Sequence, residues 1–103
     1  MTALKKRARA LEDKFAHDQE FLFKAEARRN ALLGLWAAAE MNRQDADAYA
    51  KEVATAHVEH PDGAFARVRE DLTASGVQID DNELRNRMVV MLRDVAREMY
   101  DGR

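Results

Sequence analysis

Residues 23–41 read FKAEARRNALLGLWAAAEM, and this stretch decides the fold class of the chain. Its apolar residues return every three or four positions, which is the repeat of an α-helix with one buried face. Gly34 interrupts that helix, and a glycine costs about 1 kcal/mol relative to alanine in a helix interior. We therefore expect another helix backbone to approach Gly34 closely, with Trp36 covering the contact.

The same stretch carries two adjacent arginines beside an apolar arc. Arg29 falls inside this arc and Arg28 at its edge. A guanidinium in such a place must be paired or reach water along its stem. The simplest interpretation is a partly buried ion pair with Glu26, and the alternative is an anion or partner site. The arc comprises Leu22, Ala25, Leu32, Leu33, Trp36 and Ala39.

Composition indicates one small helical domain. The chain has 103 residues, a single proline, four glycines and 35% charged residues. It contains no cysteine, which excludes disulfides and thiolate metal sites. A formal net charge of -2 argues against a general nucleic-acid binder, and no apolar run approaches the length of a membrane span. We expect a cytoplasmic protein.

Three further amphipathic segments follow, and their limits are marked by turn and cap residues. Asp45 or Asp47 can cap the second helix, Pro61 must end it, and Asp62 can cap the third. Gly76 is the expected left-handed terminator of the third helix. Asp80 and Glu83 fit a capping box at the start of the fourth helix.

The pattern predicts an all-α fold, a four-helix bundle with a mobile or conditionally helical N-terminal extension. Residues 1–103 form a single domain, in which an N-terminal segment of residues 1–15 precedes a bundle of residues 16–101. Helices are expected at about 17–41, 46–59, 63–75 and 81–100. The N-terminal segment is locally basic, and its apolar positions keep helical spacing: Leu4, Ala8, Leu11 and Phe15.

Catalytic chemistry is not indicated by the sequence. His57 and His60 stand one helical turn apart, but a metal needs a third ligand, and surface histidines are commoner than zinc sites, so no metal site is predicted. Ser75 sits at a helix end, and no Gly-rich phosphate loop is present. We expect a protein that is not an enzyme.

Several strings resemble the zeta-subunit family of ATPase inhibitors, small α-proteobacterial proteins that bind the F-type ATP synthase. The likeness covers nearly the whole chain. It rests on FAHD at 15–18, FKAEARRN at 23–30, LLGLWAA at 32–38, AYAKEV at 48–53 and RMV at 87–89.

The resemblance implies a four-helix bundle that docks on the catalytic sector of the synthase, peripheral on the membrane-bound enzyme and without membrane insertion. The N-terminal segment would become helical between catalytic subunits and rotor stalk, and so inhibit ATP hydrolysis. No cofactor would be required, ADP or ATP would be a regulatory ligand, and the free protein would be a monomer. The partner-binding residues would be Leu4, Lys5, Arg7, Ala8, Leu11 and Phe15.

The nucleotide site cannot be carried over by motif, so we select Lys24, Arg28 and Arg29 because a phosphate needs cationic donors. The basic run ALKKRAR at 3–9 departs from the family pattern, which starts with acidic residues, and could weaken or retune inhibition. Two alternatives stay open: an ADP/ATP-responsive helical binding module with weak or no inhibition, and a scaffold that self-associates through the fourth helix. Control by pH through His17, His57 and His60 is also open.

Overall fold

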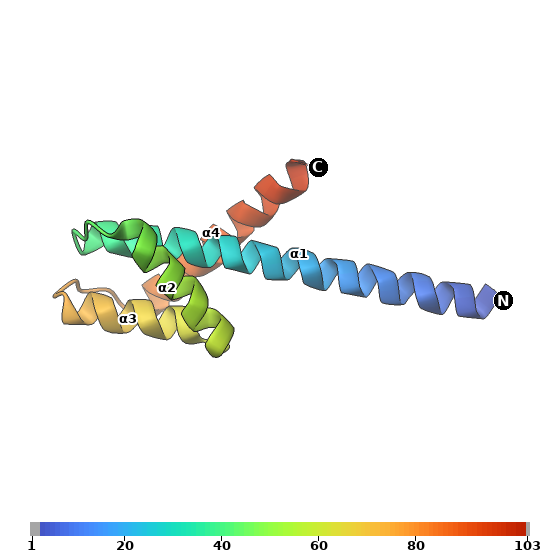
Figure 1. Ribbon diagram of the computed structural model, residues 1–103, viewed down its shortest axis with the longest axis horizontal. Coiled ribbons are helices and arrows are strands. Elements are labelled where there is room, and N and C mark those ends of the chain that lie inside the picture. The colour runs from blue at the N-terminus through green and yellow to red at the C-terminus, as the bar shows by residue number, and fades with distance from the viewer. Residues whose placement is uncertain (1–2, 103) are drawn as a thin grey trace.

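The protein is a bundle of four α-helices from which one helix projects (Figure 1). The computed structural model describes the backbone of residues 3–102. Side chains are described for residues 17–102 and, nearer the N-terminus, for residues 3, 6 and 10. No strand occurs in this range. The helices are α1 (Ala3–Glu40), α2 (Ala46–Glu59), α3 (Gly63–Ala74) and α4 (Asp81–Asp101).

These bounds follow the sequence closely after residue 40. α2 has the predicted limits, and α3 and α4 differ from them by one residue at their C-terminal ends. α1 is longer than the predicted 17–41 because the helix continues back to Ala3. The N-terminal extension is therefore helical and continuous with the bundle helix.

α1 is the central element, because most of the contacts between helices involve it. Its buried face differs from the predicted arc: Leu22 and Leu32 are 49% and 42% exposed, and Ala39 is exposed too. The buried residues are Ala25, Arg29, Asn30, Leu33, Ala37 and Ala38. The arc is turned because α2 covers the side of α1 that carries Gly34.

The prediction for Gly34 is confirmed. A Cβ atom placed on Gly34 would lie 2.6 Å from the Cα atom of Ala50 in α2, far inside van der Waals contact. The small side chains at these two positions let the helix backbones meet. Trp36 does not cover this contact, because its ring packs toward α4 under the guanidinium of Arg87, 4.3 Å from the ring centroid.

Tyr49 holds α2 against α3. Its side chain is completely buried, and its hydroxyl donates a 2.8 Å hydrogen bond to Asp71 Oδ2 in α3. Burial, reinforced by that hydrogen bond, raises the pKa of Tyr49 well above its usual value. Arg67 also bonds Asp71, at 2.7 Å, and Arg43 lies over the Tyr49 ring at 4.5 Å. The Tyr49 hydroxyl therefore remains protonated and acts as a hydrogen-bond donor among the charged side chains of Arg43, Arg67 and Asp71.

Two of the predicted caps use their carboxylates differently. Asp80 caps α4, accepting a 3.1 Å hydrogen bond from Asn82 N, but among the described residues no hydrogen bond from Asp80 N to Glu83 completes the predicted capping box. Asp45 and Asp62 occupy the N-cap positions of α2 and α3, but neither side chain accepts a cap hydrogen bond. Arg43 and Arg85 bind these carboxylates instead, each through two hydrogen bonds. A bidentate guanidinium is a stronger hydrogen-bond donor than a backbone amide, so each carboxylate binds the arginine and not the N-terminal amides of its helix.

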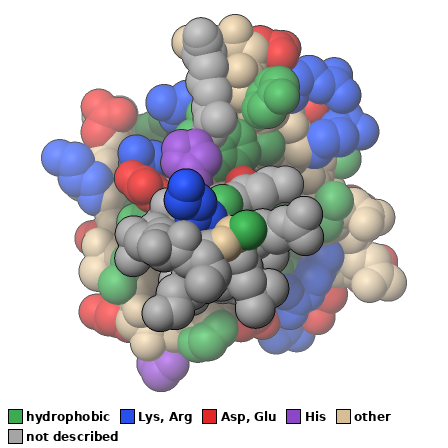
Figure 2. Space-filling model, turned by 90° about the vertical axis from the view of Figure 1, so that its right-hand side faces the viewer, with side chains coloured by type: hydrophobic (Ala, Val, Ile, Leu, Met, Phe, Trp, Pro, Cys, Tyr) green, Lys and Arg blue, Asp and Glu red, His purple; other side chains and the backbone are tan. Residues whose placement is uncertain are grey.

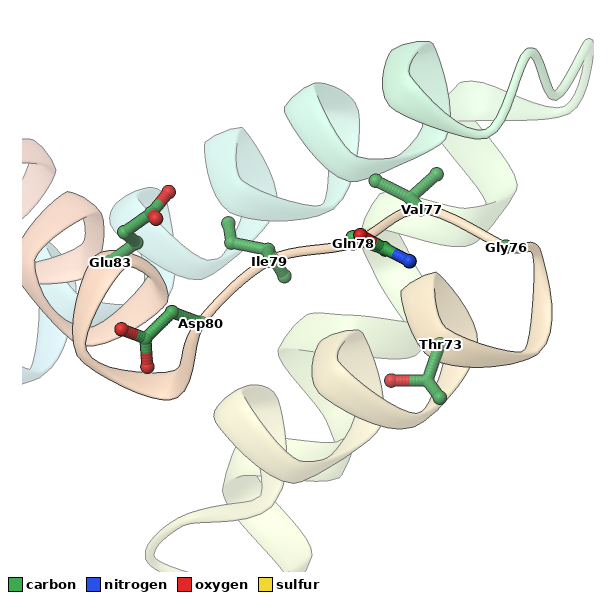
Figure 3. Close-up of a pocket in the computed structure, with 7 residues that line it drawn as sticks. All are labelled: Thr73, Gly76, Val77, Gln78, Ile79, Asp80 and Glu83. Carbon is green, nitrogen blue, oxygen red and sulfur yellow. The ribbon is translucent and has the colours of Figure 1, made fainter.

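The connection from α3 to α4 is an extended segment that starts at a left-handed glycine. Gly76 has φ +80°, as predicted for a helix terminator. Val77 and Ile79 then pack against the core, while the segment borders an open hollow of about 680 Å³ (Figure 3). The charged side chains lining this hollow, Asp80 and Glu83, are both acidic, which does not suit an anionic ligand.

Candidate functional site

The projecting part of α1 is the first candidate site. The molecule measures 62 × 27 × 24 Å and has a radius of gyration of 17.3 Å, whereas a compact domain of this size has about 13 Å. Figure 1 shows the cause: the N-terminal part of α1 runs well beyond the other three helices. On the face from which it projects, acidic and basic side chains are interspersed (Figure 2).

The face of α1 that enters the bundle continues along this projection. At 100° per residue, positions 4, 8, 11 and 15 fall within about 40° of Leu33, which is completely buried in the bundle. The side chains of Leu4, Lys5, Arg7, Ala8, Leu11 and Phe15 lie outside the described residues, so their contacts stay a prediction. Gln19, Glu26 and Arg29 fall on the same side between residues 15 and 33, so the apolar positions share one side of α1 without forming a continuous stripe.

Arg29 is the unusual residue of the bundle, because its side chain is buried without a carboxylate partner among the described residues. It is 8% exposed; its Nε donates to Asn30 Oδ1 at 2.7 Å and its NH1 to the Met88 carbonyl at 3.2 Å. Burial lowers the pKa of Arg29, against a smaller opposing effect of Glu26. The predicted Glu26–Arg29 ion pair is therefore wrong: Glu26 accepts from His57 instead, with Oε2 and Nε2 3.3 Å apart.

A small cavity of about 160 Å³ opens beside Arg29. His57 from α2 and Arg85 from α4 also line it, next to the apolar walls of Phe65 and Met88. Arg85 lies over the Phe65 ring at 3.7 Å and binds Asp62 at 2.9 and 2.8 Å. Two guanidinium groups and an imidazole from three helices thus line the cavity together with the Asp62 carboxylate, which already binds Arg85.

The predicted nucleotide residues do not come together. Lys24 is exposed and pairs with Glu20 at 3.1 Å, Arg28 is exposed, and of the three only Arg29 lines the cavity. Helical geometry explains the separation, because Lys24 and Arg29 differ by about 140° around α1. Sequence reasoning missed His57 and Arg85 at this site, and no spacing rule links them to Arg29.

His57 and His60 do not form a metal site. His60 is exposed at the C-cap of α2, and His57 faces Glu26. Among the described residues, no group of three His, Cys, Asp or Glu side chains is placed to hold a metal ion. Within the same residues, no helix combines the length and the apolar character needed to cross a membrane.

Comparison with known proteins identifies the family. The family model for ATPase inhibitor subunit zeta matches residues 1–98. The chain belongs to this family. No curated protein sequence matches it at significant similarity. One string that suggested the zeta family, FKAEARRNALLGLWAA, supplies much of the buried face of α1: its completely buried residues include Ala25, Asn30, Leu33 and Ala37. Membership indicates an inhibitor subunit that associates with ATP synthase.

Proposed function

We propose that this chain inhibits ATP hydrolysis by the F-type ATP synthase by inserting the N-terminal part of α1 between catalytic subunits and rotor stalk. The observation that carries the proposal is the projection of α1 beyond the bundle, and the stripe of apolar positions Leu4, Ala8, Leu11 and Phe15 supports it from the sequence. The bundle then acts as the body that carries this helix. It remains outside the catalytic sector because three packed helices cannot enter the same gap.

An amphipathic helix of this kind suits a groove between subunits. Such helices bind by laying apolar residues at helical spacing into a hydrophobic groove. A free helix of about 16 residues is only marginally stable in water, so contact with the enzyme supplies stability that the projection lacks alone. Continuity with the bundle helix gives a preformed nucleus, which lowers the entropic cost of ordering the segment on binding.

Charges flank the stripe. Lys5 and Arg7 fall about 80° to either side of the Leu33 direction, at the edges of the proposed contact. A basic pair there favours an acidic rim on the enzyme. Reversing both, as Lys5→Glu with Arg7→Glu, should weaken inhibition and reduce its sensitivity to salt. Unchanged inhibition with the same salt dependence would show that Lys5 and Arg7 do not contribute to the contact with the enzyme.

The proposed contact is tested by one substitution on two faces of the same helix. Leu11→Gln places glutamine on the stripe, whereas Lys6→Gln places it about 180° from the Leu33 direction. We expect Leu11→Gln to raise the concentration for half-inhibition of ATP hydrolysis about tenfold, consistent with the burial lost by a leucine. Lys6→Gln should leave it within a factor of about two. Equal effects of the two variants would argue against the stripe as the contact.

The second candidate function is that of an ADP/ATP-responsive module with weak or no inhibition. It is favoured by the cavity at Arg29, His57 and Arg85, whose guanidinium groups suit phosphate oxygens, although the Asp62 carboxylate lines the same cavity. Titration with ADP should shift backbone amide NMR signals of residues that line this cavity. Arg85→Gln should weaken binding, whereas Lys24→Gln should not. Amide signal shifts centred on Lys24 would favour a nucleotide site at the residues selected from the sequence. The absence of shifts at millimolar ADP would exclude nucleotide binding as a function of this chain.

A further inference from the structure

The outer flank of α4 carries a regular stripe of exposed residues, one of which, Arg87, stacks on Trp36 of α1. Five exposed residues form this α4 flank, with spacings of four, three, four and three: Glu83, Arg87, Val90, Asp94 and Arg97. That spacing keeps them on one side of the helix, about 100° from the buried residue Leu84. Figure 1 shows that the C-terminal part of α4 diverges from the bundle, which leaves this flank accessible.

The α4 flank is hollowed and partly apolar. A groove of about 560 Å³ runs along it, with apolar walls from Ile79, Val90 and Met91. Val90 is 44% exposed at the middle of the stripe. The Arg87 guanidinium is held over the Trp36 ring, at 4.3 Å from its centroid, so it is already ordered at the edge of the groove. Trp, Arg and Met are the residue types enriched in protein–protein contacts.

The order of charges along the α4 flank is complementary to the same order read in the opposite direction. From Glu83 to Arg97 the stripe is negative, positive, apolar, negative, positive. Rotation by 180° about an axis through the region of Val90 exchanges Glu83 with Arg97 and Arg87 with Asp94. Each exchange places opposite charges together, which is the condition for an isologous contact between identical surfaces.

We propose that two copies of this chain associate through their α4 flanks, antiparallel, with Val90 near the two-fold axis. Glu83 of each copy then faces Arg97 of the other, and Arg87 faces Asp94. Glu83 and Arg97 take part in none of the ion pairs described for residues 17–102, so both are available. Asp94 exchanges only an exposed 3.3 Å contact with Arg93. Within one copy Glu83 and Arg97 stand about 21 Å apart along the helix, too far to pair.

The association is weak. One side of a single helix buries less than the roughly 800 Å² per partner of a standard interface, and exposed ion pairs add little. We expect a dissociation constant on the order of 0.1 mM, in the range of a weak, transient contact. Dilute protein is then monomeric, as the resemblance to the family implies, and the dimer forms at high concentration and low salt. The inference is independent of the inhibitory function.

Charge reversal with complementation tests the pairing. Sedimentation velocity at low salt, from about 0.01 to about 1 mM, brackets the expected constant. Glu83→Arg and Arg97→Glu should each weaken self-association at least about tenfold, because two attractive pairs per dimer become repulsive. An equimolar mixture of the two variants should associate like the wild type, since every cross-pair is again of opposite sign. Glu70→Arg on α3 makes the same charge change elsewhere and should have no effect.

Each outcome decides for or against the proposal. Restored association in the mixture supports it, and unfolded chains could not produce that result. A wild-type protein that stays monomeric at about 1 mM overturns the proposal. A dimer that ignores both reversals, or that responds equally to Glu70→Arg, also overturns this pairing and leaves another surface as the contact.

Discussion

The Cα atom of Ala50 lies only 2.6 Å from the position that a Cβ atom on residue 34 would occupy. Helix packing therefore requires glycine at position 34. Gly34→Ala should therefore destabilise the protein although alanine is the better helix former. Its propensity gain is about 1 kcal/mol, and forcing two backbones apart typically costs 1–3 kcal/mol or more. We expect a net loss of up to about 2 kcal/mol in urea unfolding.

Ala39→Gly provides the control for the contribution of propensity. Ala39 is exposed near the end of α1, so this change should cost about 1 kcal/mol through backbone entropy alone. A Gly34→Ala variant that is more stable than the wild type would show that the two helices do not approach as closely as described.

Arg29 should not tolerate lysine. Its guanidinium bridges Asn30 Oδ1 and the Met88 carbonyl, at 2.7 and 3.2 Å, and a single ammonium cannot reproduce this geometry. Arg29→Lys should lower the free energy of unfolding by about 1–3 kcal/mol, since a buried acceptor loses its donor. Arg28→Lys is the matched control, because Arg28 is exposed one position away. Equal stabilities of the two variants would contradict the buried bridge.

The Arg85–Asp62 pair should give a small acid-dependent contribution to stability. The hydrogen bonds from Arg85 lower the pKa of Asp62 below its usual 3.8. A carboxylate whose pKa is depressed in the folded state stabilises the fold above its unfolded pKa, and this contribution disappears as pH falls through the folded pKa. Because both side chains are largely exposed, solvent screens the pair and the contribution to stability is small.

Asp62→Asn should accordingly flatten the decline of unfolding free energy as pH falls below about 4. Arg85→Gln should produce a similar flattening, and the double variant should add nothing to either single change. Urea unfolding at several pH values measures all three. A decline in Asp62→Asn as steep as that of the wild type would place the acid sensitivity at another carboxylate.

The helices could be predicted because their limits are local. Pro61 ends α2, Gly76 adopts the left-handed conformation that closes α3, and Asp80 caps the first turn of α4. Each of these effects acts within four residues of the chain, so a single sequence contains it. The need for a close neighbour at Gly34 was also predictable, because only packing offsets a mid-helix glycine.

The side-chain partners could not be predicted in the same way. Arg29 binds the carbonyl of Met88, 59 positions away, and Glu26 pairs with His57 across two helices. Sequence-local reasoning assigned Glu26 to Arg29 and gave Asp62 a capping hydrogen bond, whereas tertiary contacts redirect both carboxylates. The cavity residues His57 and Arg85 meet Arg29 only after the crossing of α1, α2 and α4 is known.

The central claim is that the projecting part of α1 carries inhibition and that the bundle folds without it. The direct measurement is ATP hydrolysis by the isolated catalytic sector of the cognate synthase, titrated with the full chain and with a chain lacking residues 1–14. That deletion stops before His17 and Phe21, which line a small cavity of about 180 Å³ together with Met99 of α4. We expect the full chain to inhibit ATP hydrolysis and the truncated chain not to inhibit it. Thermal unfolding of the truncated chain should remain cooperative. Unchanged hydrolysis at saturating full-length protein, or full inhibition by the folded truncated chain, would contradict it.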